Sequence, residues 1–216
     1  MRQRLSKPPG SRKPSNRRGT EAEARLARIL SEAKAQFLAK GYSGASLNDV
    51  IAGSGGSKAT IQKYFGGKAG LFATVVAEAA HQLVESAHLA VAQGSPAQIL
   101  QAFGESVLHF YLRPDALHVY RGVIAAGHPH ASVAKAFYEQ GHAQIVAALA
   151  SCLRNWHEQG ILHSQDATAD ADRFLHLLRA GLYEQTLLGL RKSHTRAEVI
   201  AQVEGSVGLF LSGLSR

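Results

Sequence analysis

The stretch 54–72, SGGSKATIQKYFGGKAGLF, places two glycine pairs around a short cationic segment. Gly55-Gly56 and Gly66-Gly67 favour turns at both ends of that segment, because glycine adopts backbone conformations that other residues avoid. The nine residues between the pairs are too few for a helix that is stable in isolation. The stretch therefore predicts a two-turn helix that its neighbours hold in place, with Ile61 and Phe65 facing inward.

Two further helices are predicted upstream of this segment. From Glu21 onward, apolar residues recur at three- and four-residue steps until Gly41, which ends the helix. Ser46 then starts a short helix as its N-cap, with Asp49 three residues later in an approximate capping box. Residues 53–56 form the turn to the cationic helix. Two short helices joined by such a turn are a helix-turn-helix, whose second helix enters the major groove of DNA.

The rest of the chain is predicted to be helical as well. It is rich in Ala and Leu, shows no alternating strand pattern, and is interrupted mainly by glycine and proline. The expected fold class is all-α, with an N-terminal three-helix helix-turn-helix domain and a larger C-terminal helical domain. The further helices are expected at 68–93, 96–112, 117–124, 132–159, 168–191 and 195–213. The expected parts are a disordered basic arm (1–18), a DNA-binding domain (19–66) and a regulatory and dimerisation domain (67–216).

Charge is distributed unevenly along the chain. Residues 1–20 contain seven basic residues and no acidic residue, residues 21–68 contain seven and four, and residues 69–216 contain ten and twelve. A cationic N-terminal end predicts a polyanionic partner there. Double-stranded DNA is the first candidate, and an anionic membrane surface is the rival. Whether the arm 1–18 touches DNA or is a solvated tail stays open.

Several classes of protein are disfavoured by composition. The single cysteine rules out a disulfide framework within the chain. No uninterrupted apolar stretch approaches the roughly 18 residues of a membrane helix, and no apolar segment follows the basic N-terminus as in a secretory signal. We therefore expect a cytoplasmic protein without a membrane partner.

The order of these features resembles the N-terminal domain of the TetR family of transcriptional regulators over about fifty residues. The family pattern is an apolar helix with a Phe, a Gly-Tyr pair, a Ser/Thr-capped helix, a turn, Ser-Lys-x-Thr-Leu-Tyr-x-Tyr-Phe, and a Lys that opens the fourth helix. This chain carries it as Phe37, Gly41-Tyr42, Ser46, 57–65 and Lys68. Three positions depart from the pattern: Gly56 replaces Val, Gln62 replaces Tyr, and Ala69 replaces an acid.

The resemblance implies a sequence-specific DNA-binding repressor, and residue chemistry suggests how it holds the phosphates. Lys58 and Lys68 would neutralise phosphates and make binding salt-dependent. Ser46, Ser57 and Thr60 can donate hydroxyls to phosphate oxygens, together with the N–H groups of helix N-termini. For the two serines, capping alone is the alternative.

Base edges and one more phosphate would be met by the rest of the short cationic helix. Ala59 and Thr60 can place methyl groups against thymine, and Gln62 can pair with adenine if it faces the groove. Tyr64 resembles the phosphate-contacting tyrosine of the family. Lys63 can contact DNA or lie on a solvated surface.

The resemblance also implies a homodimer, whose interface is a four-helix bundle of two C-terminal helices per subunit. The expected pair is 132–159 and 168–191. A dimer places two recognition helices roughly 34–36 Å apart or more, so the operator should be a near-palindrome. Small residues at helical spacing are also compatible with ordinary core packing. The candidate interface residues are Ala143, Ala147, Ser151, Gly181 and Leu188.

The second half resembles the C-terminal domain of AefR-like members of the family. This implies a pocket between the middle helices for a small-molecule inducer, whose identity the sequence does not give. An aromatic stripe at helical spacing is equally a feature of a plain core. The candidate lining residues are Phe103, Val107, Phe110, Tyr111, His118, Tyr120 and Ile124.

Enzymatic and metal-dependent functions find little support. No nucleophile elbow, phosphate loop or motif-defined carboxylate pair is present, so we expect no catalytic residue and no cofactor. Of the eleven histidines, His109, His118, His128 and His130 are the candidates for a shared site, but they lack HExxH or zinc-finger spacing, so no metal site is expected. The alternative to a specific regulator is a nonspecific polyanion or membrane-surface binder that acts through residues 1–18.

Overall fold

The computed structural model describes residues 16–89, 94–127 and 131–214, and over these residues the chain is helical with no strand. The predicted all-α class is confirmed. Residues 1–15 of the predicted basic arm lie outside the described residues, as do His128 and His130. The elements are α1 (Asn16–Gly44), α2 (Leu47–Ser54), α3 (Lys58–Phe65), α4 (Lys68–Leu89), α5 (Pro96–Tyr111), α6 (Pro114–Gly127), α7 (Ala131–Phe137), a π-turn η1 (Tyr138–His142), α8 (Ala143–Glu158), α9 (Ala167–Arg179), α10 (Leu182–Leu187) and α11 (Arg196–Leu214).

The first helix begins at Asn16 rather than Glu21, so the last three residues of the predicted arm are helical. Its predicted end at Gly41 agrees with the structure, because φ is 66° and ψ is 178° there, which is not helical. Beyond this kink a short helical turn completes α1 up to Gly44. The backbone conformation at Gly41 suits glycine and turns the chain toward α2.

The predicted single helix 132–159 is interrupted by η1. A side chain at Gly141 would lie 2.9 Å from Val76 Cγ1, so glycine permits α4 to approach closely at this point. The π-turn widens the helix beside that contact and buries the imidazole of His142. Such turns inside helices are frequent at functional sites.

The predicted single helix 168–191 is likewise wrong. α9 ends at Arg179, Ala180 is extended, and Gly181 has φ 63° and ψ −93°. Gly181 allows this sharp reversal, which ordinary side chains avoid. α10 follows as a separate short helix, so Arg179 is the last residue of α9 and lies next to the interruption between the two helices.

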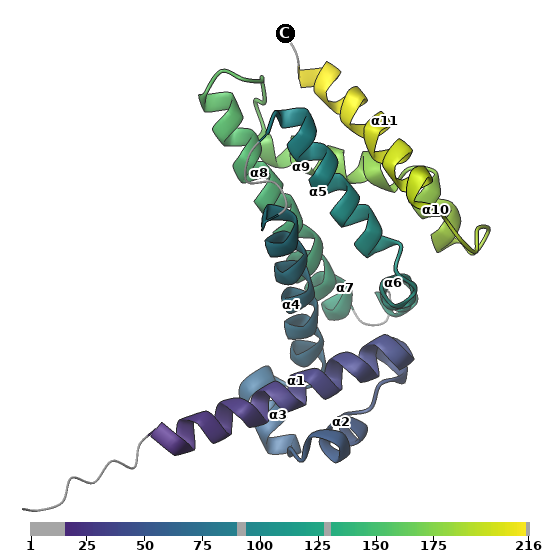
Figure 1. Cartoon of the computed structure of the whole chain (residues 1–216). Helices are drawn as coiled ribbons and strands as arrows, with labels where there is room; N and C mark the ends of the chain where they lie inside the picture. The colour runs from purple at the N-terminus through teal and green to yellow at the C-terminus, as the bar shows by residue number, and fades with distance from the viewer. Residues whose placement is uncertain (1–15, 90–93, 128–130, 215–216) are drawn as a thin grey trace, which may run out of the picture.

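The helices form a small unit of α1, α2 and α3, which is the predicted DNA-binding end, and a larger body; α4 connects the two (Figure 1). One hydrophobic cluster surrounds Ile29, Phe37, Ile61 and Phe72, and a second extends from Ala80 to Phe210. The first cluster continues beyond residue 66 into α4, α6 and α7. The domain division at 66–67 therefore stays a prediction, because this core contains side chains from both sides of it.

α11 is the one described helix that is long and apolar enough to cross a membrane, by length and composition only. The mean hydropathy of an 18-residue segment of this helix is 1.2, and 28% of that segment is buried. The sequence reading did not single it out. One side of α11 packs against α5 and α9, so the helix is part of the body. The other side is exposed. Besides the charged Glu204, it carries small and apolar residues: Ala197, Ala201, Gly205, Gly208 and Leu209.

Candidate DNA-binding surface and ligand cavity

Ser46 and Ser57 cap the two helices of the predicted helix-turn-helix. Ser46 Oγ accepts a hydrogen bond from the Asn48 amide at 3.1 Å, and Ser57 Oγ accepts one from the Thr60 amide at 3.1 Å. The hydroxyls of Ser57 and Thr60 are also 2.9 Å apart. Capping is thus observed for both serines. Phosphate contacts by the same hydroxyls stay a prediction.

Gly56 makes the turn between α2 and α3 unusually close to α1. A Cβ atom at Gly56 would lie 2.8 Å from Ile29 Cδ1 and 3.2 Å from Ser54 Oγ. Ile29 is fully buried, so its side chain fills the volume that the Val of the family pattern would need. The apolar contact in this turn is therefore supplied by α1.

α3 presents its polar side to solvent because one residue anchors the other side. Ile61 is fully buried and Phe65 is half-buried, as the inward positions require. Thr60 is half-buried as well. The exposed residues are Lys58, Ala59, Gln62, Lys63 and Tyr64. The structure therefore brings the predicted DNA-contacting residues of α3 onto one accessible surface.

Lys68 lies at the start of α4 against the end of α1. Its Nζ is 4.7 Å from the centroid of the Tyr42 ring and donates to the Ser43 carbonyl at 3.4 Å. Burial lowers the pKa of Lys68. Tyr42 in turn packs edge-on against Phe72, with centroids 5.2 Å apart. The charge that the sequence assigns to a phosphate is thus held by the kinked end of α1.

A cavity of about 970 Å³ lies beside α4 and reaches from α1 to the α9–α10 break. Its wall includes Lys34 and Phe37, so it touches the first helix of the DNA-binding end. Its volume is that of a site for a drug-sized ligand. Four of the seven predicted lining residues line it: Phe110, Tyr111, Tyr120 and Ile124.

The other three predicted lining residues do not line this cavity. Phe103 and Val107 are buried on the face of α5 that packs against α9 and α11. Between them, a side chain at Gly104 would lie 2.7 Å from Val203 Cγ1, which shows how closely α11 approaches. His118 is exposed, and its Nε2 would be 3.5 Å from a side chain at Gly41. The prediction of these three as lining residues is not supported.

The sequence reading missed many of the polar and aromatic lining residues, among them His142, His176, Arg179 and Tyr183. Arg179 Nη2 donates to the Tyr120 hydroxyl at 2.7 Å, which ties α9 to α6. The signal was an arginine within the apolar run FLHLLRAGLY, which periodicity alone assigns to the helix surface.

A histidine–carboxylate cluster borders the same cavity. Donor atoms of His142, Asp172 and His176 lie within 4.8 Å of one another, a set that could hold a metal ion. The cluster is already hydrogen-bonded: His142 Nε2 is 2.6 Å from Asp172 Oδ1, and His176 Nδ1 is 2.8 Å from the Asp172 carbonyl. None of the four histidines singled out in the sequence belongs to it. The expected absence of a metal stays a prediction.

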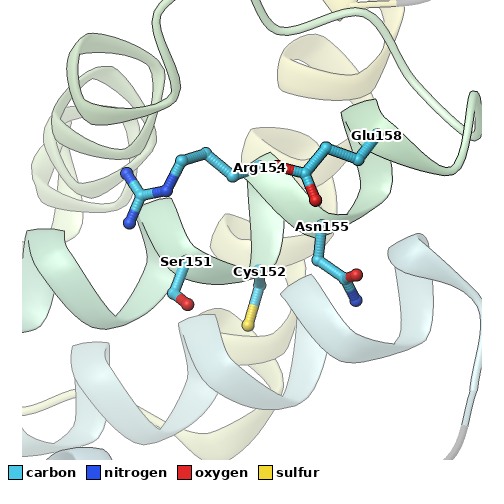
Figure 2. A pocket seen from close by; sticks show the side chains of 5 residues that line it. All are labelled: Ser151, Cys152, Arg154, Asn155 and Glu158. Carbon is cyan, nitrogen blue, oxygen red and sulfur yellow. The ribbon is translucent and has the colours of Figure 1, made fainter.

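The predicted dimer residues are largely accessible in the single chain. Ala147, Ser151, Gly181 and Leu188 are exposed, and Ala143 is half-buried. Burial raises the pKa of the neighbouring Cys152 thiol, which therefore stays protonated and is a weak nucleophile. A hollow of about 470 Å³ on α8 is lined from this one helix by Ser151, Cys152, Arg154, Asn155 and Glu158 (Figure 2). The interface itself stays a prediction.

Comparison with known families matches both halves of the chain. Residues 29–75 match the family described as bacterial regulatory proteins, tetR family. Residues 98–213 match the family described as AefR-like transcriptional repressor, C-terminal domain. No curated protein matches the sequence.

Solved structures share the whole fold. A TetR-family transcriptional regulator from Mesorhizobium loti is similar with a TM-score of 0.77 and 24% identity, covering 90% of this chain and 98% of that one. The flavonoid-responsive regulator FrrA is similar with a TM-score of 0.70 and 24% identity, covering 89% and 98%. A transcriptional regulator from Pseudomonas aeruginosa has a TM-score of 0.67 and 23% identity, covering 88% and 92%. At these identities the likeness concerns the fold.

Proposed function

Because the chain belongs to the TetR family of bacterial regulatory proteins, we propose that it acts as a homodimer on a near-palindromic operator and leaves it when a ligand fills the cavity. It is a DNA-binding transcriptional regulator of a non-enzymatic family whose members are typically ligand-responsive repressors. The observation that supports the proposal of ligand control is that the cavity is lined by α1, which belongs to the DNA-binding end, and by α6, which packs against α1.

α6 connects the cavity to the DNA-binding end. Tyr120 and Val123 line the cavity. Between them, a Cβ atom at Gly122 would lie 3.9 Å from Gly41 Cα and from Tyr42 N, so α6 passes close to α1 at the kink. Because the ring of Tyr42 contacts Lys68, a shift of α6 would reach a predicted phosphate-binding residue through two contacts.

The middle of α6 is also fixed to the body. Arg121 donates to the carbonyls of Leu187 and Thr186 at 2.7 Å and 2.8 Å, at the end of α10. A ligand that binds better to one position of α6 than to another would shift the population of DNA-binding conformers. The spacing of the two recognition helices in a dimer would then change.

The proposed dimer interface includes α11 as well as the residues expected from the sequence. If nothing covered the exposed side of α11, its small and apolar residues would face water; the side chain of Leu209 is 68% exposed. Leu188 and Leu190, at and after the end of α10, are also exposed apolar side chains, with exposed fractions of 66% and 78%. A second copy of the chain is the occupant that the family resemblance implies. We also expect a cytoplasmic location, where operator DNA is found.

The inducer is expected to contain an aromatic or other apolar body. The cavity is bounded by Phe110, Tyr111, Tyr120, Phe137 and Tyr183. FrrA responds to flavonoids, which makes planar ring compounds reasonable first candidates for this chain.

The test is salt-dependent binding to the DNA upstream of the protein's own gene, followed by fluorescence anisotropy. We expect this DNA to bind at least tenfold more tightly than random duplex of equal length, and added inducer to weaken it. Equal affinity for both duplexes would mean that binding is nonspecific, as in the polyanion alternative.

A further inference from the structure

Arg179 is a guanidinium on the cavity wall without a carboxylate partner. Within residues 16–89, 94–127 and 131–214, no acidic oxygen lies within 4.0 Å of its nitrogens. Arg113, which lines the same cavity, has such a partner, since its Nε donates to Asp115 Oδ1 at 3.0 Å. Asp172, the acid nearest to Arg179 along the cavity side of α9, is engaged by His142. The two arginines of one cavity therefore differ in their charge balance.

Three tyrosine rings surround the Arg179 guanidinium. Its Cζ lies 5.8 Å from the centroid of Tyr111, 5.2 Å from Tyr120 and 5.1 Å from Tyr183. Such rings stabilise a cation without neutralising it. Burial raises the pKa of Tyr111, and raises that of Tyr183 to about 12, so these phenols stay uncharged. The positive charge of Arg179 is therefore uncompensated at the wall of an apolar cavity.

We infer that the ligand of this cavity combines an apolar ring system with an anionic group of the carboxylate or sulfonate type, and that this group pairs with Arg179. The inference rests on the proposed function, because it concerns the inducer cavity. A planar guanidinium can donate two parallel hydrogen bonds to such an anion. The surrounding apolar wall strengthens the pairing, since water screens it less there than at the surface.

The same pairing provides a route to α6. Arg179 Nη2 donates to the Tyr120 hydroxyl, and Tyr120 is on α6. An anion that accepts from Nη2 would compete with Tyr120 for that donor. Binding in this geometry would change a contact between α9 and the helix that passes close to Gly41 on α1.

The test uses two fluorescent dyes that differ in one group. Anilinonaphthalene sulfonate carries the anion, and N-phenyl naphthylamine has the same rings without it. Binding of each is titrated to the full-length wild type, Arg179→Met and Arg113→Met. We expect Arg179→Met to weaken binding of the sulfonate dye by about tenfold or more and binding of the neutral dye by less than about threefold, as loss of a charge-assisted hydrogen bond requires. Arg113→Met should leave the affinities for both dyes within about threefold of the wild-type values.

The controls separate a specific pairing from damage to the fold. Circular dichroism and the melting temperature report folding of each variant, and Arg179→Lys keeps the charge and should retain part of the preference for the sulfonate. Equal losses for both dyes in Arg179→Met, equal effects of the two Met variants, or no binding of the sulfonate dye by the wild type would each overturn the inference.

Operator binding in the presence of the dye distinguishes this inference from the proposed function. Sulfonate binding that depends on Arg179 but does not release DNA would support the anion subsite and contradict ligand control. DNA release by the sulfonate dye, with equal affinity of this dye for Arg179→Met and for the wild type, would support ligand control and overturn the anion subsite.

Discussion

Gly56→Val restores the residue of the family pattern in the helix-turn-helix, and we expect it to destabilise this protein. The new Cβ would lie 2.8 Å from Ile29 Cδ1 and 3.0 Å from Ile29 Cγ1, whereas unstrained carbon contacts are about 3.5–4.0 Å. Ile29 must therefore retreat by roughly 1 Å within a packed core. Overpacking of this kind costs about 1–3 kcal/mol.

A smaller opposing effect comes from the unfolded chain. Replacing a glycine whose φ is not positive stabilises a protein by about 0.4–1 kcal/mol, because the unfolded state loses freedom. The net loss for Gly56→Val is then about 1–2 kcal/mol. Ile29→Ala alone should cost about 2–4 kcal/mol, since it removes a fully buried side chain. The double variant should be more stable than the sum predicts, by about 1 kcal/mol or more.

The assay is urea unfolding of the four proteins of this cycle, followed by circular dichroism. Gly55→Ala is the matched control: no atom lies within 4 Å of its new Cβ, but φ is 68°. It should destabilise through backbone strain of about 1–2 kcal/mol and show no coupling to Ile29→Ala. Additivity of Gly56→Val and Ile29→Ala within about 0.5 kcal/mol would refute the overpacking argument.

Three further predictions concern DNA binding and assembly. Lys68→Ala should weaken operator binding about tenfold and reduce the slope of log affinity against log salt concentration by about 1 per lost phosphate contact. The control Lys135→Ala, on the exposed side of α7, should change neither quantity. An unchanged slope for Lys68→Ala would mean that Lys68 contacts only Tyr42 and Ser43 and no phosphate. Gln62→Ala should relax the preference at one base pair per half-site by about 1–3 kcal/mol, measured by selection from a randomised operator, and an unchanged preference would show that Gln62 does not read bases. Leu209→Glu should convert the dimer into a monomer, as measured by light scattering, and Ala147→Glu is the corresponding variant on α8. If only Ala147→Glu gave a monomer, the interface would lie on α8 and not on α11.

The helix-turn-helix could be predicted because its signals are local. Ser46 and Ser57 cap two helices, and the residues that indicate each helix start lie within three positions of the serine. Ile61 is the buried apolar residue that helical spacing predicts. The break at Gly181 also had a sequence signal, which was read as a small residue within a continuous helix.

The cavity could be predicted only in part, because its walls depend on distant contacts. Phe103, Val107, Phe110 and Tyr111 share one side of α5, and helical spacing cannot show that the cavity reaches only the last two of them. Arg179 was missed for the same reason, since two of the three rings around it come from α5 and α6.

The close approach of α6 to α1 separates what the protein detects from how it responds. At this approach a Cβ atom on Gly122 would lie 3.9 Å from Gly41 Cα, and the residues packed around it are apolar or aromatic, such as Tyr42 and Val123. Apolar packing of this kind transmits a change of position and depends little on the chemistry of the inducer. Substitutions in the cavity could therefore change the inducer over evolutionary time without redesign of the link to DNA, and an engineer could exchange the cavity residues while leaving these two glycines in place.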